Sequence, residues 1–405
     1  YYRMTRHFGD IPLIKEKPID LDEAALPRSP KQEVLDYALA NVNKAIDYLP
    51  ETYTNDNIGR ITKGAALTLK ADMYLDMASY AKFHKGQDAT ELWKEAALAA
   101  KQVIDLNLYG LEDDFAYIFK AEANNNNKEV ILAFQYKEDE KTHMLPILAS
   151  PAGTGITGQG WASFCPTRQL VDSYETTEGK TIYESDLYDK NNPWENRDAR
   201  LKKTFFLPGY ECLRPNGSYE PYMPHPAYNK DERINHEGGG ITGYMYLKYN
   251  DQELEKPSAS WTNFSLYRYA EVLLIYAEAL NEYDPNNTQI AWAVNQVRKR
   301  AELPGVDNLI GNQEAMREKI REERRHEFVA EHKRYFDILR WKIAEKVLNE
   351  PGYGINKDEN APIGDYTVEQ FLGQNRTFDA SKHYLWPIPQ SARDKNPNLG
   401  QNPNW

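Results

Sequence analysis

Cysteine and long apolar stretches are both scarce in this chain of 405 residues. The 2 cysteines, Cys165 and Cys212, lie in no CxxC motif, which excludes the common zinc and dithiol redox motifs. They leave open either one disulfide bridge or two buried thiols. No run of about 18 apolar residues occurs, since even the most apolar segment, residues 269–280, is interrupted by Glu271 and Glu278. No segment is therefore predicted to span a bilayer.

An excess of positive charge is also absent. Lysine and arginine number 49 against 61 aspartates and glutamates, so the net charge is -12, a sign that repels the phosphates of nucleic acids. Nucleic acid is therefore not an expected partner. Polar aromatic rings are instead plentiful, with 28 Tyr and 8 Trp beside 13 Phe. Such rings suit half-buried contacts with sugars or peptides, although most are expected at helix interfaces.

The common catalytic motifs are missing as well. The sequence holds no GxSxG, HExxH or GxGxxG pattern, and residues 59–64 fail as a phosphate loop because Ala65 occupies the lysine position. His225, His236 and Glu237 match no standard metal-ligand spacing, so solvated loop residues are the favoured interpretation. We therefore expect no catalytic residues, no metal and no cofactor.

Helical periodicity is strong in both halves of the chain. Two helix pairs, around Ala71 and Ala277, look internally related without a strict period, which is typical of degenerate tetratricopeptide-like hairpins. The predicted fold class is mainly α, a tetratricopeptide-like helical hairpin scaffold (an α-α superhelix) with an irregular loop-rich subdomain containing short strands. Helices are predicted over residues 31–48, 62–81, 90–104, 267–282, 288–301 and 312–348, the last with one bend.

The composition changes in the middle and at the end of the chain, where Pro, Gly, Asn and Tyr are frequent and helical periodicity is weak. Residues 130–136 and 244–249 are predicted as short strands. The end of the chain is expected to be an extended segment packed on the insert. The predicted divisions are a first part of the scaffold (1–129), an irregular ligand-binding insert (130–257), a second part of the scaffold (258–350) and the extended C-terminal segment (351–405).

A stripe of charge marks the last helical tract. Glu323, Glu327, Glu331, Arg334 and Asp337 are three or four residues apart, so they share a face if the helix is continuous. A glycoside hydrolase needs two carboxylates opposed across a cleft, and one helical face does not supply that geometry. A buried ion-pair network with neighbouring arginines is the favoured interpretation.

The same tract carries a family resemblance. Residues 323–341, ERRHEFVAEHKRYFDILRW, resemble the C-terminal signature of the SusD/RagB family of outer-membrane nutrient-binding lipoproteins, except that His332 stands where the family usually has Gly. Four further segments are similar to the family and follow its order. They are FGDIPLI (8–14), GRITKGAAL (59–67), RYAEVLL (268–274) and the tail from PIP (387–389) to NP (402–403).

The resemblance implies a surface-exposed lipoprotein of the outer membrane with a tetratricopeptide-like scaffold. It also implies a SusC-type TonB-dependent transporter as partner, and a lipid anchor in an N-terminal region that precedes this sequence. The implied function is non-enzymatic binding of oligosaccharides or polysaccharides and their delivery to that transporter. A peptide-binding nutrient receptor on the same scaffold is the alternative, and a glycoside hydrolase is a less favoured one.

The ligand-binding candidates gather in one glycine-rich loop. Residues 149–164 include four glycines immediately before Trp161, so this large ring follows residues that carry no side chain and leave space around it. The C-H face of a sugar stacks on an exposed indole while its hydroxyls bind polar groups nearby. Similar family members also place a binding Trp just before the stretch that here is 166–174. A buried anchor for the loop is the alternative for Trp161. Tyr136, His143 and Phe164 are second candidates because they lie in or beside the same segment.

Overall fold

The computed structural model is mainly helical, as predicted, and its described residues form two compact units. The first comprises Tyr1–Leu106, His332–Glu350 and Arg376–Trp405, and the second comprises Asn107–Glu331 and Pro351–Asn375. The structure describes residues 1–405 except 17–19, 21–24, 229, 231, 234–239, 357, 359, 361–368 and 371–375. Within the described residues, no helix has the length and apolar character that a membrane crossing requires.

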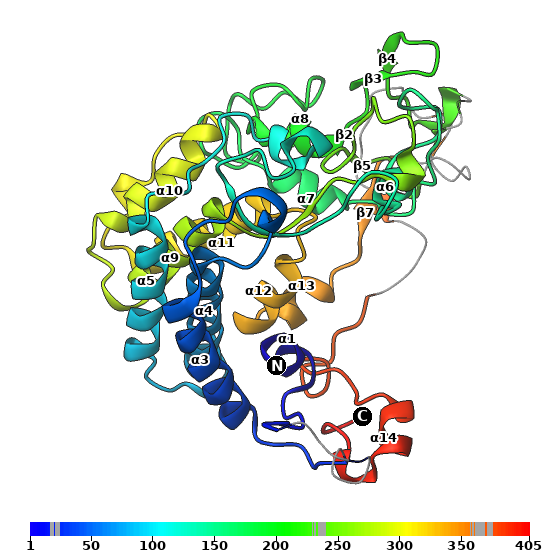
Figure 1. Cartoon of the computed structure of the whole chain (residues 1–405). Coiled ribbons are helices and arrows are strands. Elements are labelled where there is room, and N and C mark those ends of the chain that lie inside the picture. The colour runs from blue at the N-terminus through cyan, green and yellow to red at the C-terminus, as the bar shows by residue number, and fades with distance from the viewer. Residues whose placement is uncertain are drawn as a thin grey trace. The chain divides into compact units, whose positions relative to one another are not determined.

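Helices packed on their sequence neighbours build the first unit. Helix α3 (Lys31–Tyr48) packs on α4 (Lys63–Ser79), and α4 packs on α5 (Thr90–Asp105), so the three lie side by side in Figure 1. Buried alanines on α4 and α5 let the two backbones approach closely. These helices confirm the predicted ranges to within a few residues. The unit also contains α1 (Tyr2–Phe8), α12 (Arg334–Arg340), α13 (Ala344–Leu348) and α14 (Gln390–Lys395).

The C-terminal segment is divided between the two units, and Pro351–Asn375 belong to the second. Residues 376–405 belong to the first unit and include a short helix, α14, so they are not extended throughout. The backbone N–H of Trp386 donates to the carbonyl of His7 at 2.7 Å, and Asn402 Nδ2 donates to the carbonyl of Phe8 at 3.0 Å. Hydrogen bonds to the start of the chain therefore hold this segment. The four ranges expected from composition stay a prediction.

In the described part of the second unit, three long helices and four strand pairs organise the fold. Helix α9 (Tyr269–Tyr283) is buried over nearly all its length and packs on α10 (Gln289–Arg300) and α11 (Gln313–Glu327). Strand β1 (Val130–Phe134) pairs antiparallel with β6 (Phe264–Arg268), which leads directly into α9. This strand explains why α9 begins two residues later than predicted.

The remaining elements of the second unit are short. The irregular character predicted for this region is confirmed. The predicted strand 244–249 is reduced to two residues, because the backbone turns at Tyr249 (φ +64°). The other pairs are β2 (Phe205–Phe206) with β5 (Met245–Tyr246), β3 (Glu211–Leu213) with β4 (Tyr219–Pro221) and β7 (Tyr353–Gly354) with β8 (Glu369–Gln370), and the helices are α6 (Leu145–Ala149), α7 (Arg168–Ser173) and α8 (Arg200–Thr204).

The last helical tract differs from its prediction. Residues 312–348 form three helices, α11, α12 and α13, and not one helix with a single bend. The breaks coincide with residues in the left-handed region, Ala330 (φ +61°), His332 (φ +59°) and Lys342 (φ +54°). His332 thus adopts the conformation that glycine favours, which accounts for the glycine usual at this position in the resembling family.

The predicted ion-pair network is confirmed in the second unit. Glu323 and Glu327 on α11 both accept from Arg200 Nη1, at 2.6 and 2.8 Å, and Glu327 also accepts from Arg268 Nη1 at 2.5 Å. Burial opposes ionisation of Glu327, but Arg300, Arg268 and Arg200 outweigh it and hold its pKa well below the usual range. The carboxylates of Glu323 and Glu327 are therefore structural.

The two cysteines are free thiols, so the disulfide alternative is wrong in this structure. Cys212 is fully buried, and burial raises its pKa to about 11. Cys165 Sγ lies 3.7 Å from Met245 Sδ, and burial likewise raises its thiol pKa. Both thiols act as small apolar groups in the second unit.

Candidate ligand-binding site

Trp161 is exposed on a backbone that is held firmly in place. Its relative exposure is 53%, so the alternative of a buried anchor is wrong. The N–H groups of Trp161, Ala162 and Ser163 donate to carbonyls of residues 147, 150 and 148 at 2.8, 3.0 and 2.8 Å. Three successive residues are therefore tied to α6 and the residue after it, while the indole projects into solvent.

The residue after Trp161 sets the direction of the chain. Ala162 has φ +47°, a left-handed conformation that is uncommon outside glycine, and its side chain is buried beside Phe206 and Met245. Burial of this methyl group in the core stabilises the strained backbone. Trp161, one residue earlier, remains exposed.

The glycines before Trp161 serve close backbone approach. A Cβ on Gly160 would lie 2.3 Å from the Pro151 carbonyl oxygen, a distance that no side chain tolerates. Gly153 (φ +75°) donates its N–H to the carbonyl of Gly158 at 2.9 Å, which closes the loop on itself. The loop is thus a compact, hydrogen-bonded support for the indole.

Two further contacts join this loop to the segment that follows β5. The N–H of Ile156 donates to the carbonyl of Gln252 at 2.9 Å, and Asn250 Nδ2 donates to Ser150 Oγ at 2.6 Å. Gln252 also accepts from the N–H of Leu213 on β3 through Oε1, at 2.9 Å. Gln252 therefore connects the Trp161 loop with the β3–β4 hairpin.

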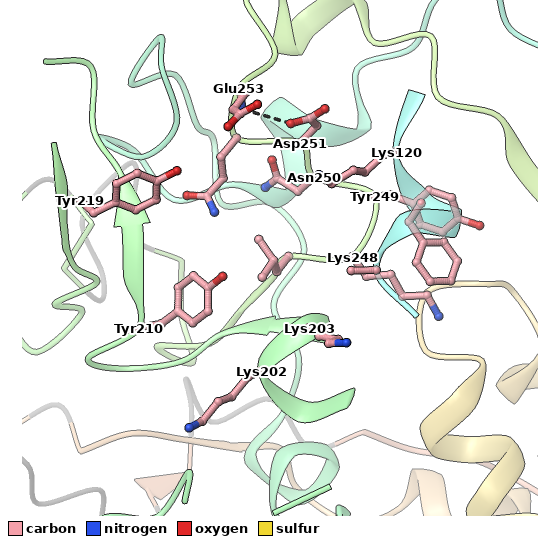
Figure 2. Close-up of a pocket in the computed structure, with 14 residues that line it drawn as sticks. Lys120, Lys202, Lys203, Tyr210, Tyr219, Lys248, Tyr249, Asn250, Asp251 and Glu253 are labelled. Atoms are coloured by element: carbon pink, nitrogen blue, oxygen red, sulfur yellow. Dashed lines mark hydrogen bonds between the residues drawn. The ribbon is translucent and has the colours of Figure 1, made fainter. Parts of the chain in front are cut away.

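A pocket of about 290 Å³ lies between this hairpin and the segment 248–253. Figure 2 shows the hydroxyls of Tyr210 and Tyr219 turned toward the space that Asn250 and Glu253 border from the other side. Tyr219 is 61% exposed, so its ring is available to a ligand. Rings combined with amides and carboxylates can stack on a sugar and bind its hydroxyls.

The lysines of this pocket are engaged by carboxylates. Lys248 is fully buried and donates to Glu331 Oε1 at 2.6 Å; burial lowers its pKa to about 8 although Glu331 opposes that shift. Lys202 and Lys203 on α8 pair with Glu195 and Asp114 at 2.6 and 2.9 Å. The pocket therefore carries little uncompensated positive charge.

The second candidates separate into two groups. Phe164 is exposed like Trp161, at 45%. Tyr136 and His143 are half-buried and pack on each other and on Phe264, with ring centroids 4.7 Å apart for the first pair. His143 Nδ1 accepts from the N–H of Leu145 at 3.2 Å and Nε2 donates to the carbonyl of Thr262 at 2.9 Å, so both ring nitrogens are engaged.

Burial lowers the pKa of His143 and keeps the ring neutral. The neutral tautomer supports the start of α6, and α6 in turn holds the Trp161 backbone. His143 is thus placed as a support of the loop. Tyr136 packs against that support.

Tyr210, Tyr219 and the segment 248–253 were not predicted from the sequence as ligand contacts. The turn Pro215-Asn216-Gly217 between them was an available signal, because Asn-Gly flanked by aromatic residues predicts a hairpin. That hairpin brings the two tyrosines onto the pocket.

No group of three or more potential metal ligands occurs among the described residues. His225 is buried, and its Nδ1 accepts from the N–H of Ala227 at 3.2 Å. His236 and Glu237 lie outside the described residues.

The fold and the site define a helical-hairpin scaffold that carries a loop-rich insert with an exposed indole. A model of the SusD family matches residues 117–405, and the chain belongs to this family. Related sequences agree with this family assignment. The chain is similar to SusD-like protein P2 of Formosa agariphila, at 27% identity over 99% of this chain and 71% of the relative, and to a SusD-like protein of Bacteroides ovatus, at 24% identity over 100% and 72%.

Solved structures agree as well and confirm the predicted fold class. A SusD-like carbohydrate binding protein from Bacteroides fragilis matches with a TM-score of 0.83 and 27% identity, over 98% of this chain and 77% of that chain. A further SusD-like protein from Bacteroides fragilis matches with a TM-score of 0.82 and 25% identity, over 100% and 77%.

Proposed function

We propose that this protein binds oligosaccharides or polysaccharides at the cell surface without cleaving them and delivers them to a TonB-dependent outer-membrane transporter. The observation that carries the proposal is the indole of Trp161, 53% exposed on a backbone held by three hydrogen bonds. An exposed tryptophan on a rigid loop loses little conformational freedom when a sugar stacks on it. Such a platform favours a flat, partly apolar ligand face.

Polar groups near the platform supply the second requirement for sugar binding. Asn250 and Gln252 belong to the segment that is hydrogen-bonded to the Trp161 loop, and they also line the pocket with Tyr210 and Tyr219. Amides both donate and accept hydrogen bonds, which matches the dual character of sugar hydroxyls. We assign the platform to Trp161 and Phe164, and the hydroxyl contacts to this pocket.

Binding without cleavage is supported by the carboxylates. Glu323, Glu327 and Glu331 are each engaged by buried arginine or lysine side chains. Asp251 and Glu253 line the pocket, but they are two residues apart on one segment, where Asp251 Oδ1 accepts from the N–H of Glu253 at 3.1 Å. Glycoside hydrolysis needs carboxyl groups on opposite sides of the scissile bond.

The family also supports a proposal for the cellular setting. Membership of the SusD family supports a surface lipoprotein of the outer membrane with a SusC-type transporter as partner. The carbohydrate binding named for the Bacteroides fragilis structure supports glycans as the ligand class.

A binding screen tests this proposal. The purified protein is applied to soluble and host-derived polysaccharides and to mixed peptides, in parallel with the variants Trp161→Ala and Trp292→Ala. Trp292 is 36% exposed on α10 and serves as the matched control. We expect glycan binding that is lost in Trp161→Ala and kept in Trp292→Ala. If the protein binds none of the glycans but binds peptides, the alternative of a peptide-binding nutrient receptor would replace this proposal.

A further inference from the structure

A second cavity, of about 330 Å³, lies beside α7 in the second unit. Arg168 and Asp172 of α7 line it, together with Tyr183 and with Tyr353 of β7. Its volume falls at the lower end of the range for small-molecule sites, about 300 to 1,000 Å³. None of the residues predicted from the sequence as ligand contacts lines this cavity.

Arg168 is the unusual residue of this cavity. It is 9% exposed, and its Nε donates to Asp172 Oδ2 at 3.0 Å. Neither Nη1 nor Nη2 makes a hydrogen bond to any described residue, and Nη1 is shielded from solvent. A buried guanidinium normally has its donors satisfied. Arg168 thus holds unused donors at the wall of a cavity.

Two other buried arginines of the same unit, Arg200 and Arg268, show a contrast. Arg200 donates to Asp198, Glu323 and Glu327, and Arg268 donates to Glu129, Glu327 and Glu331. These guanidinium groups are saturated by three carboxylates each. Arg168 has one carboxylate, so a further acceptor is missing in the folded chain.

The charge near Asp172 points to the nature of that acceptor. Arg197 is buried beside α7, and its Nη1 and Nη2 donate to four backbone carbonyls, those of residues 171, 172, 174 and 193. Neither nitrogen forms an ion pair with a described carboxylate, so Asp172 faces two arginines. Asp198 also acts on Arg197, but its carboxylate is paired with Arg200 at 2.7 Å. In a chain with a net charge of -12, a local excess of positive charge favours an anionic group at this place.

The rim of the cavity adds an aromatic face. Tyr183 is 84% exposed, and Tyr353 contributes a second, half-buried ring. An exposed ring beside a buried cation offers stacking for a pyranose and hydrogen bonds for an acidic substituent.

We propose that this cavity binds the carboxylate of a uronic acid residue in an acidic glycan. Arg168 donates to the carboxylate through Nη2, the guanidinium nitrogen that is neither hydrogen-bonded nor shielded; Tyr183 packs on the sugar ring, and Asp172 accepts from a hydroxyl. The inference rests on the proposed glycan binding and names its substrate class. An acidic peptide side chain would satisfy the arginine but would leave the ring face of Tyr183 without a sugar to stack on.

The test compares acidic glycans with their neutral forms. Oligogalacturonate, oligoalginate and chondroitin fragments are each titrated calorimetrically beside the same oligosaccharide with its carboxyl groups methyl-esterified. The wild-type protein should bind at least one acidic form about tenfold more tightly than its ester, as expected for a charge-assisted hydrogen bond in a shielded site. Equal affinities for acid and ester in every pair would overturn the inference.

Variants place the effect at this cavity. Arg168→Lys keeps the positive charge beside Asp172 but loses the planar set of guanidinium donors. Tyr183→Ala removes an exposed ring that is not part of the buried core. Arg168→Lys should reduce the preference for the acidic form, and Tyr183→Ala should weaken binding of that form, whereas Tyr48→Ala, which removes a tyrosine 87% exposed on α3, should change neither. Thermal unfolding of each variant confirms that it is folded. An unchanged preference in Arg168→Lys together with an unchanged affinity in Tyr183→Ala would contradict the assignment.

The same titrations separate this inference from the proposed function. Binding of the neutral esters that depends on Trp161, without any preference for the acids, would leave glycan binding standing and remove the uronate site. No binding of any glycan would remove both. If no glycan binds but polyglutamate binds in a way that depends on Arg168, the cavity would be reassigned to an acidic peptide. If a sulfated galactan competes for the site as well as the uronic acid oligosaccharide does, a specific carboxylate site would be contradicted.

Discussion

Arg268 and Glu331 form a bidentate ion pair at the centre of the second unit, with Nε to Oε2 at 2.7 Å and Nη2 to Oε1 at 2.8 Å. Arg268 is both the last residue of β6 and the N-cap of α9, while Glu331 follows the end of α11 by four residues. The pair therefore joins a strand of the irregular region to the helical scaffold. The side chains of both residues are about 1% exposed.

Loss of Arg268 should strongly destabilise the fold. Arg268→Met leaves Glu331, Glu129 and Glu327 with one fewer cation in a buried site, and we expect the free energy of unfolding to fall by about 3 to 5 kcal/mol. Urea denaturation followed by circular dichroism measures this change.

The control for this prediction is an exposed pair in the same unit, Lys256 with Asp139 at 3.1 Å. Lys256→Ala should change the free energy of unfolding by less than about 1 kcal/mol. Equal effects of the two substitutions would contradict the structural role assigned to the buried pair.

Acid should weaken the support of the Trp161 loop through His143. Burial lowers the folded-state pKa of His143 below its ordinary value of 6.5. Below that pH the unfolded chain binds more protons than the folded one, so the free energy of unfolding falls as the pH falls. Protonation also removes the Nδ1 lone pair that accepts from Leu145. We expect wild-type protein to lose thermal stability between pH 7.5 and 5.

His143→Asn is the matched variant, because a side-chain oxygen can still accept from the Leu145 N–H while the titrating group is gone. Its stability should depend less on pH than that of the wild type, since all other histidines are shared. An NMR titration that places the pKa of His143 at or above 6.5 would disprove this account.

Crowding at Gly160 should couple loop geometry to ligand binding. In Gly160→Ala the new methyl group would meet the Pro151 and Ser150 carbonyl oxygens at 2.3 and 2.6 Å, so the backbone beside Trp161 must move. We expect a lower melting temperature and a glycan affinity reduced about tenfold or more, because a small displacement of a positioned group is costly. Calorimetric titration with a glycan that binds the wild type measures the affinity.

Gly110→Ala provides the comparison, since its nearest neighbour would be Lys128 Cδ at an ordinary 3.7 Å. That variant should bind glycan like the wild type. If Gly160→Ala also binds like the wild type, the rigid loop is not what positions the indole.

Local pattern was sufficient for most helices. The range predicted for α3 agrees with its bounds, Lys31–Tyr48, and α5 and α10 agree to within one residue at each end. The tract after Asn312 was predicted less well, because its charged face continues through residues whose backbone turns left-handed at Ala330 and His332. Side-chain periodicity does not report such a turn when the residue is not glycine.

The candidate site was predictable only in part. The glycine spacing drew attention to Trp161, and its exposure agrees with a binding role that the proposed experiments test. The role of His143 as a support of α6 depends on Leu145 and Thr262, and the latter is 119 residues away. A pattern of residues close together along the chain cannot reveal a contact between residues so far apart in sequence.

The helices, the family and the loop that carries the exposed indole can be read from the sequence alone, because each depends on residues close together along the chain. Which charged groups have their hydrogen bonds satisfied becomes clear only in the folded chain. Arg268 is saturated by Glu129, Glu327 and Glu331, whereas Arg168 keeps unused donors beside a cavity. The two arginines look alike in sequence, and the difference arises because hydrogen-bond partners come from segments that folding brings together.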